Sequence, residues 1–244
     1  MSYQNDHNHI VSAFDRELTE LRSLVVKMGD AVIRQTQDAL TALLDQDTAR
    51  ARQVIDREPD IDALSSAADE EVFRVIAKRQ PTAVDLRLVL AISRVVGELE
   101  RAGDKAARIA NNTLKLIDEG DAAAVPTVLG KPLRALEALV VERLEQAISG
   151  LVDADLGRAI TVFESEPQLS SDRQDLSDGL VASNAPFDGI SLAALLTIAH
   201  AMERIGNHAG NIAEQVVYVI TAEDVRYRNR HLLINALKHR AEGN

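Results

Sequence analysis

The sequence contains no cysteine and no tryptophan, and aromatic residues make up only 3% of its 244 residues. Without cysteine the chain has neither disulfide bonds nor thiolate ligands, so any metal ion must be held by oxygen and nitrogen atoms. Alanine, leucine, valine and isoleucine supply nearly all of the apolar content. Helices pack such side chains well, so this composition favours an all-helical protein.

Long apolar runs and positive net charge are missing as well. No apolar run approaches the roughly twenty residues needed to span a bilayer, and residues 1–6 lack the basic and apolar regions of a signal peptide. The net charge of -11 argues against nucleic-acid binding, which depends on neutralising phosphates with basic side chains. We therefore expect a cytoplasmic protein with no membrane insertion and no nucleic-acid partner.

One charged segment occurs twice in the chain. Residues 100–104 read Glu-Arg-Ala-Gly-Asp, and residues 203–207 read Glu-Arg-Ile-Gly-Asn. Around both segments apolar residues recur in alternating steps of four and three, which is the pattern of a helix with one narrow apolar seam. The first seam consists of Leu88, Ile92, Val95, Leu99, Ala102, Ala106, Ile109 and Leu116, and the second of Leu195, Ile198, Met202, Ile205, Ala209, Ile212, Val216 and Val219.

The repeat extends to the rest of the chain. The turn at Asp45–Asp47 and the Glu58-Pro59 pair, which should interrupt a helix, recur 108 residues later, whereas the acidic segments recur after 103. The sequence predicts an all-α fold of two tandem three-helix bundles, with six long antiparallel helices and internal pseudo-two-fold symmetry. We assign residues 1–120 to the first bundle and 121–244 to the second, with an irregular linker over 118–132. The basic residues after 225 are expected to form a solvated tail.

Glu100 and Asp104 lie four residues apart, one above the other beside the first seam. Like charges at this spacing repel each other, so the pair requires a cation. A metal ion is one candidate, and an arginine is the other. Arginines that would form a solvated, ion-paired face recur every seven residues along the same helix, as Arg87, Arg94, Arg101 and Arg108.

The duplicated segments resemble the two signature helices of the PhoU family, which are phosphate-signalling proteins of bacteria. The resemblance rests on residues 81–111, with Pro81, Asp85-Leu86-Arg87 and the Glu98–Lys105 segment, and on residues 203–214. It implies two three-helix bundles, a homodimer and no enzymatic activity. It also implies negative regulation of the phosphate-starvation response and of phosphate uptake. The family is thought to act as an adaptor between a PstB-like transporter ATPase and a PhoR-like sensor histidine kinase.

Some members of the family bind iron, zinc or other metals on Glu/Asp-x-x-x-Asp motifs. Carried over to this chain, the resemblance makes Glu100, Asp104, Glu203 and Asn207 the candidate ligands for iron, zinc, manganese or magnesium. Asn207 departs from the usual aspartate and weakens the second site. The residues expected to contact a protein partner are Arg101, Arg108, Arg204, His208 and Asn211.

Two kinds of enzyme fit the sequence poorly. A di-iron enzyme in a helical bundle needs Glu-x-x-His motifs, and no histidine has a glutamate three residues before it. Neither glycine-rich phosphate-binding motif occurs, and no nucleophile arrangement can be assigned. The remaining alternative to the adaptor is a metal-independent acidic helical scaffold that binds another protein partner.

Overall fold

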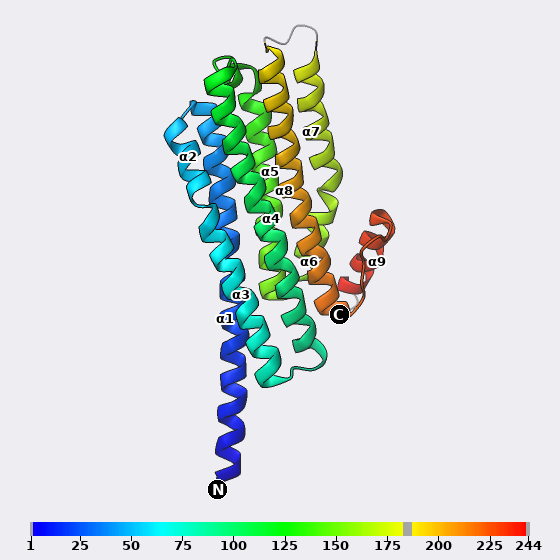
Figure 1. Ribbon diagram of the computed structural model, residues 1–244. Coiled ribbons are helices and arrows are strands. Elements are labelled where there is room, and N and C mark those ends of the chain that lie inside the picture. Colours follow the sequence, from blue (N-terminus) through cyan, green and yellow to red (C-terminus); the bar gives the residue numbers. More distant parts are fainter. Residues whose placement is uncertain (1, 183–186, 243–244) are drawn as a thin grey trace.

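The computed structural model describes residues 2–182 and 187–242, and all regular secondary structure within them is helical (Figure 1). The all-α prediction is therefore confirmed. The first half contains α1 (Ser2–Asp45), α2 (Thr48–Asp56), α3 (Glu58–Arg79) and α4 (Ala83–Glu119). The second half contains α5 (Val125–Asp153), α6 (Leu156–Glu164), α7 (Glu166–Val181), α8 (Gly189–Thr221) and α9 (Arg230–Glu242).

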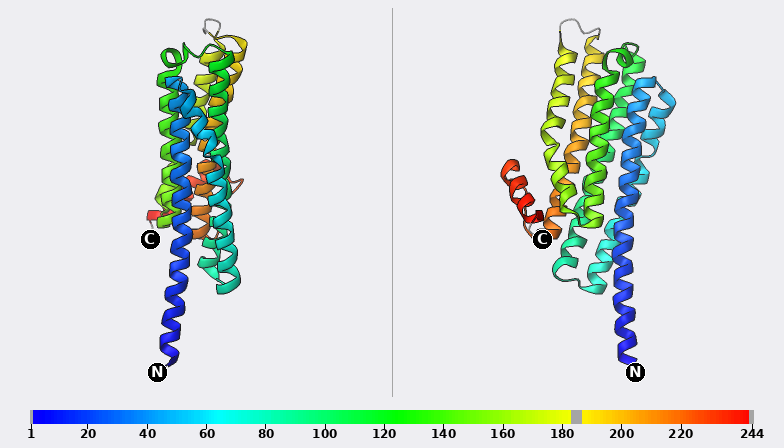
Figure 2. Two further views of the ribbon diagram at one scale, coloured as in Figure 1. Left: turned by 60° about the vertical axis from the view of Figure 1, so that its left-hand side comes forward. Right: turned by 180° about the vertical axis from the view of Figure 1, so that it is seen from behind.

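The helices form two three-helix bundles side by side. In the first, α1 and α4 pack together, and α2 and α3 cover them as one interrupted helix; α5, α8 and the α6–α7 pair repeat this arrangement. The bundles meet mainly along α4 and α8, and α1 also contacts α5 (Figure 2). Every residue of the two predicted seams is buried, which confirms the period read from the sequence.

The two halves share the same local turn chemistry. Gln46 and Ala154 both adopt a left-handed backbone conformation, at φ 55° and 52°. The next residue in each half, Asp47 or Asp155, then caps the following helix through its carboxylate. The helix is interrupted at Arg57 in one half and at Ser165 in the other, just before each Glu-Pro pair. Proline fits there because a residue in the first turn of a helix needs no backbone donor.

Two equivalent glycines let the helices approach closely. A Cβ atom on Gly103 of α4 would lie 2.9 Å from Ile61 of α3, and one on Gly206 of α8 would lie 2.7 Å from Leu169 of α7. The contact pairs are equivalent in the duplication, since Ile61 and Leu169 are 108 residues apart, as the Glu-Pro pairs are, and Gly103 and Gly206 are 103 apart, as the acidic segments are. The repeat therefore extends to side-chain packing, and it places the two acidic segments beside α3 and α7.

Two expectations about the second half are corrected. The irregular linker is shorter than predicted, because α4 continues to Glu119 and α5 begins at Val125, with Pro126 in its first turn and Pro132 inside the helix. The basic tail contains a helix, α9, whose Leu233 and Leu237 are buried. These two leucines are four residues apart and so share one face, a signal that the density of basic residues obscured. No helix among the described residues has the length and apolarity needed to cross a membrane.

Candidate functional site

The first acidic segment lies on the side of α4 that faces α3. The hydroxyl of Ser65, on α3, donates a hydrogen bond of 2.9 Å to Oε2 of Glu100. Asp104 is exposed one turn further along α4. Both acids lie outside the buried seam, as predicted, because Leu99, Ala102 and Ala106 occupy the positions that face the core.

Two further acids from α3 join this pair. Burial raises the pKa of Glu58, and the charges of Asp104 and Asp62 raise it further. Burial also raises the pKa of Asp104, as do Glu100 and Asp62, against the opposing charge of Lys105. We call Glu58, Asp62, Glu100 and Asp104 the first-half cluster. Within the described part of the chain, none of the four carboxylates forms an ion pair.

The second acidic segment has a different environment. Arg173 Nε lies 3.4 Å from Oε2 of Glu203, and His200 Nδ1 lies at the same distance from that oxygen. Arg173 stands 108 residues after Ser65, so an arginine occupies the position from which a serine contacts Glu100 in the first half. Asn207 is partly buried. Glu203 therefore has its compensating cation within the chain.

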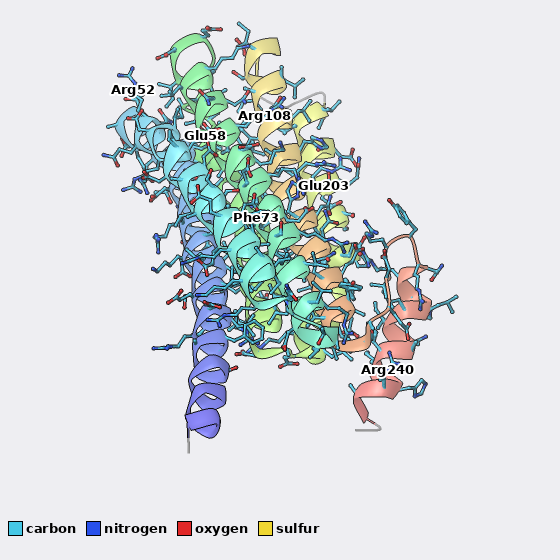
Figure 3. All side chains as sticks on the ribbon, turned by 60° about the horizontal axis from the view of Figure 1, so that its bottom comes forward. Arg52, Glu58, Phe73, Arg108, Glu203 and Arg240 are labelled. Atoms are coloured by element: carbon cyan, nitrogen blue, oxygen red, sulfur yellow. The ribbon has the colours of Figure 1, made fainter. Side chains whose placement is uncertain are left out.

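The C-terminal helix supplies a second arginine to this half. Arg230 of α9 donates to Glu166 at 2.9 Å and to Glu214 at 2.8 Å, and its guanidinium lies 4.4 Å from the ring centre of Phe163. Glu166 is the counterpart of Glu58. We call Glu166, Glu203 and Glu214 the second-half cluster. In Figure 3, Glu58 and Glu203 lie on opposite sides of the central α4–α8 pair.

A buried polar junction connects the two halves. His208 Nδ1 of α8 donates to Oε2 of Glu98 on α4 at 2.7 Å, and the Asn211 amide donates to the same oxygen at 2.8 Å. Burial alone would raise the pKa of Glu98, but these hydrogen bonds and the charge of Arg101 outweigh it and lower the pKa to about 2. His208 is only 4% exposed, so it serves this junction and does not present its ring to a partner.

The arginine row also contributes to the contact between the halves. Arg87 donates to the Val219 carbonyl at 3.2 Å, and Arg94 donates to Gln215 at 3.2 Å and lies over the Tyr218 ring. Arg87 is partly buried, whereas Arg94, Arg101 and Arg108 are exposed. Arg204, on α8, is exposed as well.

The fit to a metal ion differs between the two copies. No three histidine, aspartate or glutamate side chains converge closely enough to hold a metal ion within the residues that the structure describes. The second copy does not fit one, because Arg173 already neutralises Glu203 and Asn207 lacks a charge. The first copy provides two carboxylates, those of Glu100 and Asp104, and among the described residues no third side chain completes a metal-binding group with them.

Several residues of this site were missed by sequence reasoning. Comparing positions 108 residues apart would have paired Ser65 with Arg173 and so revealed the asymmetry. Asp62 lies four residues after Glu58, which is also a readable signal. The role of Glu98 carried no such signal, because its partners come from a helix more than a hundred residues away.

The fold and site define a class of tandemly duplicated six-helix bundles with one charged signature segment in each half. A family model described as the PhoU domain matches residues 25–113 and again 133–216, so the chain belongs to the PhoU family. The resemblance stated from the sequence is thereby confirmed.

Curated relatives and solved structures agree with this assignment. The phosphate-specific transport system accessory protein PhoU homolog of Pseudomonas aeruginosa is 32% identical over 97% of this chain and 96% of its own. The PhoU accessory protein of Escherichia coli is 30% identical over 93% of each chain. The crystal structure of PhoU from Pseudomonas aeruginosa matches with a TM-score of 0.77 at 31% identity, covering 86% of this chain and 100% of that one. The phosphate transport system regulatory protein PhoU of Streptococcus pneumoniae also gives 0.77, at 27% identity, over 87% of this chain and 99% of that one.

Proposed function

We propose that this chain is a negative regulator of the phosphate-starvation response and of phosphate uptake. It acts as a cytoplasmic adaptor between a PstB-like transporter ATPase and a PhoR-like sensor histidine kinase, and it catalyses no reaction itself. The proposal is supported by relatives named as phosphate transport accessory proteins, which match this chain over nearly its full length. The alternative is an acidic scaffold for another protein partner.

The surface that we expect to contact a partner is the first-half cluster, because of its negative charge. Its carboxylates are half-buried or exposed and form no ion pair among the described residues, so they can pair with basic groups on another protein. The hydrogen bonds to Glu98 fix α8 against α4, so we expect a partner that binds the first half to affect the position of the second half as well. We propose that the chain works as a homodimer, which leaves one such cluster on each subunit.

The experiment is a binding measurement with purified components. The chain, a PstB-like ATPase subunit and the cytoplasmic part of a PhoR-like kinase are mixed in pairs, and complex formation is measured by sedimentation. We expect both partners to bind the wild-type chain and at least one to be lost with E100A/D104A. Glu203→Ala is the matched control, since it removes an acid that is already paired. Failure of either partner to bind would leave the scaffold alternative.

A metal ion on Glu100 and Asp104 is the alternative to a basic partner group on the same carboxylates, and it is limited to the first copy. It is supported by two neighbouring carboxylates that form no ion pair among the described residues and by the preference of magnesium, manganese and iron for carboxylate oxygen. Elemental analysis of protein never exposed to chelator should find one iron, zinc, manganese or magnesium ion per chain, absent from E100A/D104A. A metal that binds only the folded state must also raise its thermal stability, so addition of the ion to metal-free protein should raise the melting temperature.

A further inference from the structure

The helix α9 is an internal occupant of the second-half cluster. Its Arg230 reaches two carboxylates, those of Glu166 and Glu214, and stacks on Phe163. Lys238, the residue after the buried Leu237, pairs with Glu164 at 2.5 Å. The second-half cluster therefore binds an arginine that a basic helix of the same chain presents to it.

The equivalent surface of the first half has no such occupant. Figure 1 shows α9 on the outer side of α6, whereas no segment drawn in colour lies on the outer side of α2. The counterparts of Glu166, Glu164 and Phe163 are Glu58, Asp56 and Ile55. Two of these three positions keep a carboxylate, and the third keeps an apolar side chain that is partly buried. The counterpart of Glu214, the second acceptor of Arg230, is the uncharged Asn111, so a second carboxylate in the first half must come from Asp62 or Asp104.

The first half also lacks the cations that the second half carries. Arg143 of α5 is 2% exposed and donates to the Gly206 and Val162 carbonyls, near Glu166. Its counterpart is Gln35, which donates to the matching Val54 carbonyl. Arg173 is replaced by Ser65, as described above. Three arginines therefore face the second-half cluster, and no residue at the equivalent positions of the first half is basic.

Two buried polar atoms beside the first-half cluster have no hydrogen-bond partner among the described residues. Gln35 Oε1, on a residue 2% exposed, lies 3.6 Å from the position of a Cβ on Gly103, next to Asp104 in the chain. His208 Nε2 is also without a partner among the described residues. Gln35 Oε1 is an acceptor, and so is His208 Nε2 in the neutral ring whose one proton, on Nδ1, is donated to Glu98. The first half thus leaves a buried acceptor unpaired at Gln35, where its counterpart Arg143 supplies donors in the second half.

We infer that the first-half cluster is a receptor for an arginine side chain presented by a basic helix of a partner protein, in the way that α9 presents Arg230 to the second half. This inference names the half and the chemistry of the contact, and it rests on the proposed adaptor function. Arginine fits better than lysine because its planar fork can donate to two carboxylates at once.

The test is binding of a labelled peptide to the full-length chain. The peptide has the sequence of residues 226–242, and its affinity is measured by fluorescence anisotropy. Arg230→Leu in the peptide should weaken binding by about tenfold or more, which corresponds to loss of one desolvated charge contact. The peptide with Arg228→Leu has the same net charge as the peptide with Arg230→Leu, but this substitution should change the affinity by less than about threefold. Because Arg52 is exposed on α2 and repels a basic peptide, the R52I chain is measured alongside.

Variants of the chain locate the peptide. D62N/D104N should weaken binding by about tenfold, whereas E166Q/E214Q should leave it unchanged, since those acids are held by the chain's own α9. The reverse pattern would mean that the peptide merely exchanges with α9, and it would refute the inference. If the peptide binds neither the wild-type chain nor the R52I chain, the inference is also refuted. The inference is refuted as well if the protein carries a stoichiometric metal ion that must be chelated before the peptide binds. Only purified chain and peptide are used, so these results are independent of whether transporter ATPase or kinase binds.

Discussion

The junction between the two halves depends on the charge of Glu98, and its contribution to stability can be calculated. The pKa of Glu98 is lowered from 4.5 to about 2. A pKa difference of about 2.5 corresponds to roughly 3 kcal/mol of folding free energy at pH 7. Little solvent discount applies, because the side chain is 16% exposed. This contribution is present above pH 4.5 and is lost as the pH falls through 2.

Glu98→Gln keeps the shape of the side chain and removes its charge. We expect the variant to be less stable than the wild type by roughly 2–3 kcal/mol at pH 7. Between pH 7 and pH 3 the wild type should lose roughly 2 kcal/mol through this group, so the difference between the two proteins should shrink by that amount. Urea unfolding at the two pH values measures both quantities, with Glu70→Gln, an exposed substitution on α3, as the control. Equal stability of Glu98→Gln and wild type at pH 7 would refute the reasoning.

Five other substitutions test the packing, three by chemical denaturation and the two leucine substitutions by limited proteolysis. Gly206→Val should cost about 1–3 kcal/mol by overpacking against α7, whereas Gly130→Ala, with open space around it, should be neutral or stabilising by roughly 0.5–1 kcal/mol. Arg143→Met should cost about 1–3 kcal/mol, because the Gly206 carbonyl loses its side-chain donor whereas the Val162 carbonyl keeps the hydroxyl of Ser165. Leu233→Asp should release α9 and expose the segment before it to limited proteolysis, and Leu232→Asp, at a position 68% exposed, should not.

The sequence predicted the fold because the information was local and repeated. The four-and-three spacing of apolar residues determined which face of α4 and α8 is buried, and the Glu-Pro pairs marked both helix interruptions. The predicted linker was too long because Pro126 was expected to exclude a helix. In the structure this proline lies in the first turn of α5, where proline is tolerated. The helix α9 was missed because two buried leucines were outweighed by the surrounding basic residues.

The site could be predicted only in part. Glu100 and Asp104 were found because they share one helix face beside the seam, whereas the contact of that face with α3 was not predicted. The asymmetry between the halves depends on Arg173 and Arg230, which reach the second-half cluster from α7 and α9. Contacts of this kind are set by how separate helices pack, so spacing along one helix carries no information about them.

The most direct test of the regulatory role is a phosphate-starvation reporter in cells grown with abundant phosphate. The E100A/D104A chain should fold normally, because both acids lie outside the core, and it should fail to repress the reporter. Glu203→Ala, expressed at the same level, should repress it as the wild type does. Full repression by a stably expressed E100A/D104A chain would contradict the account.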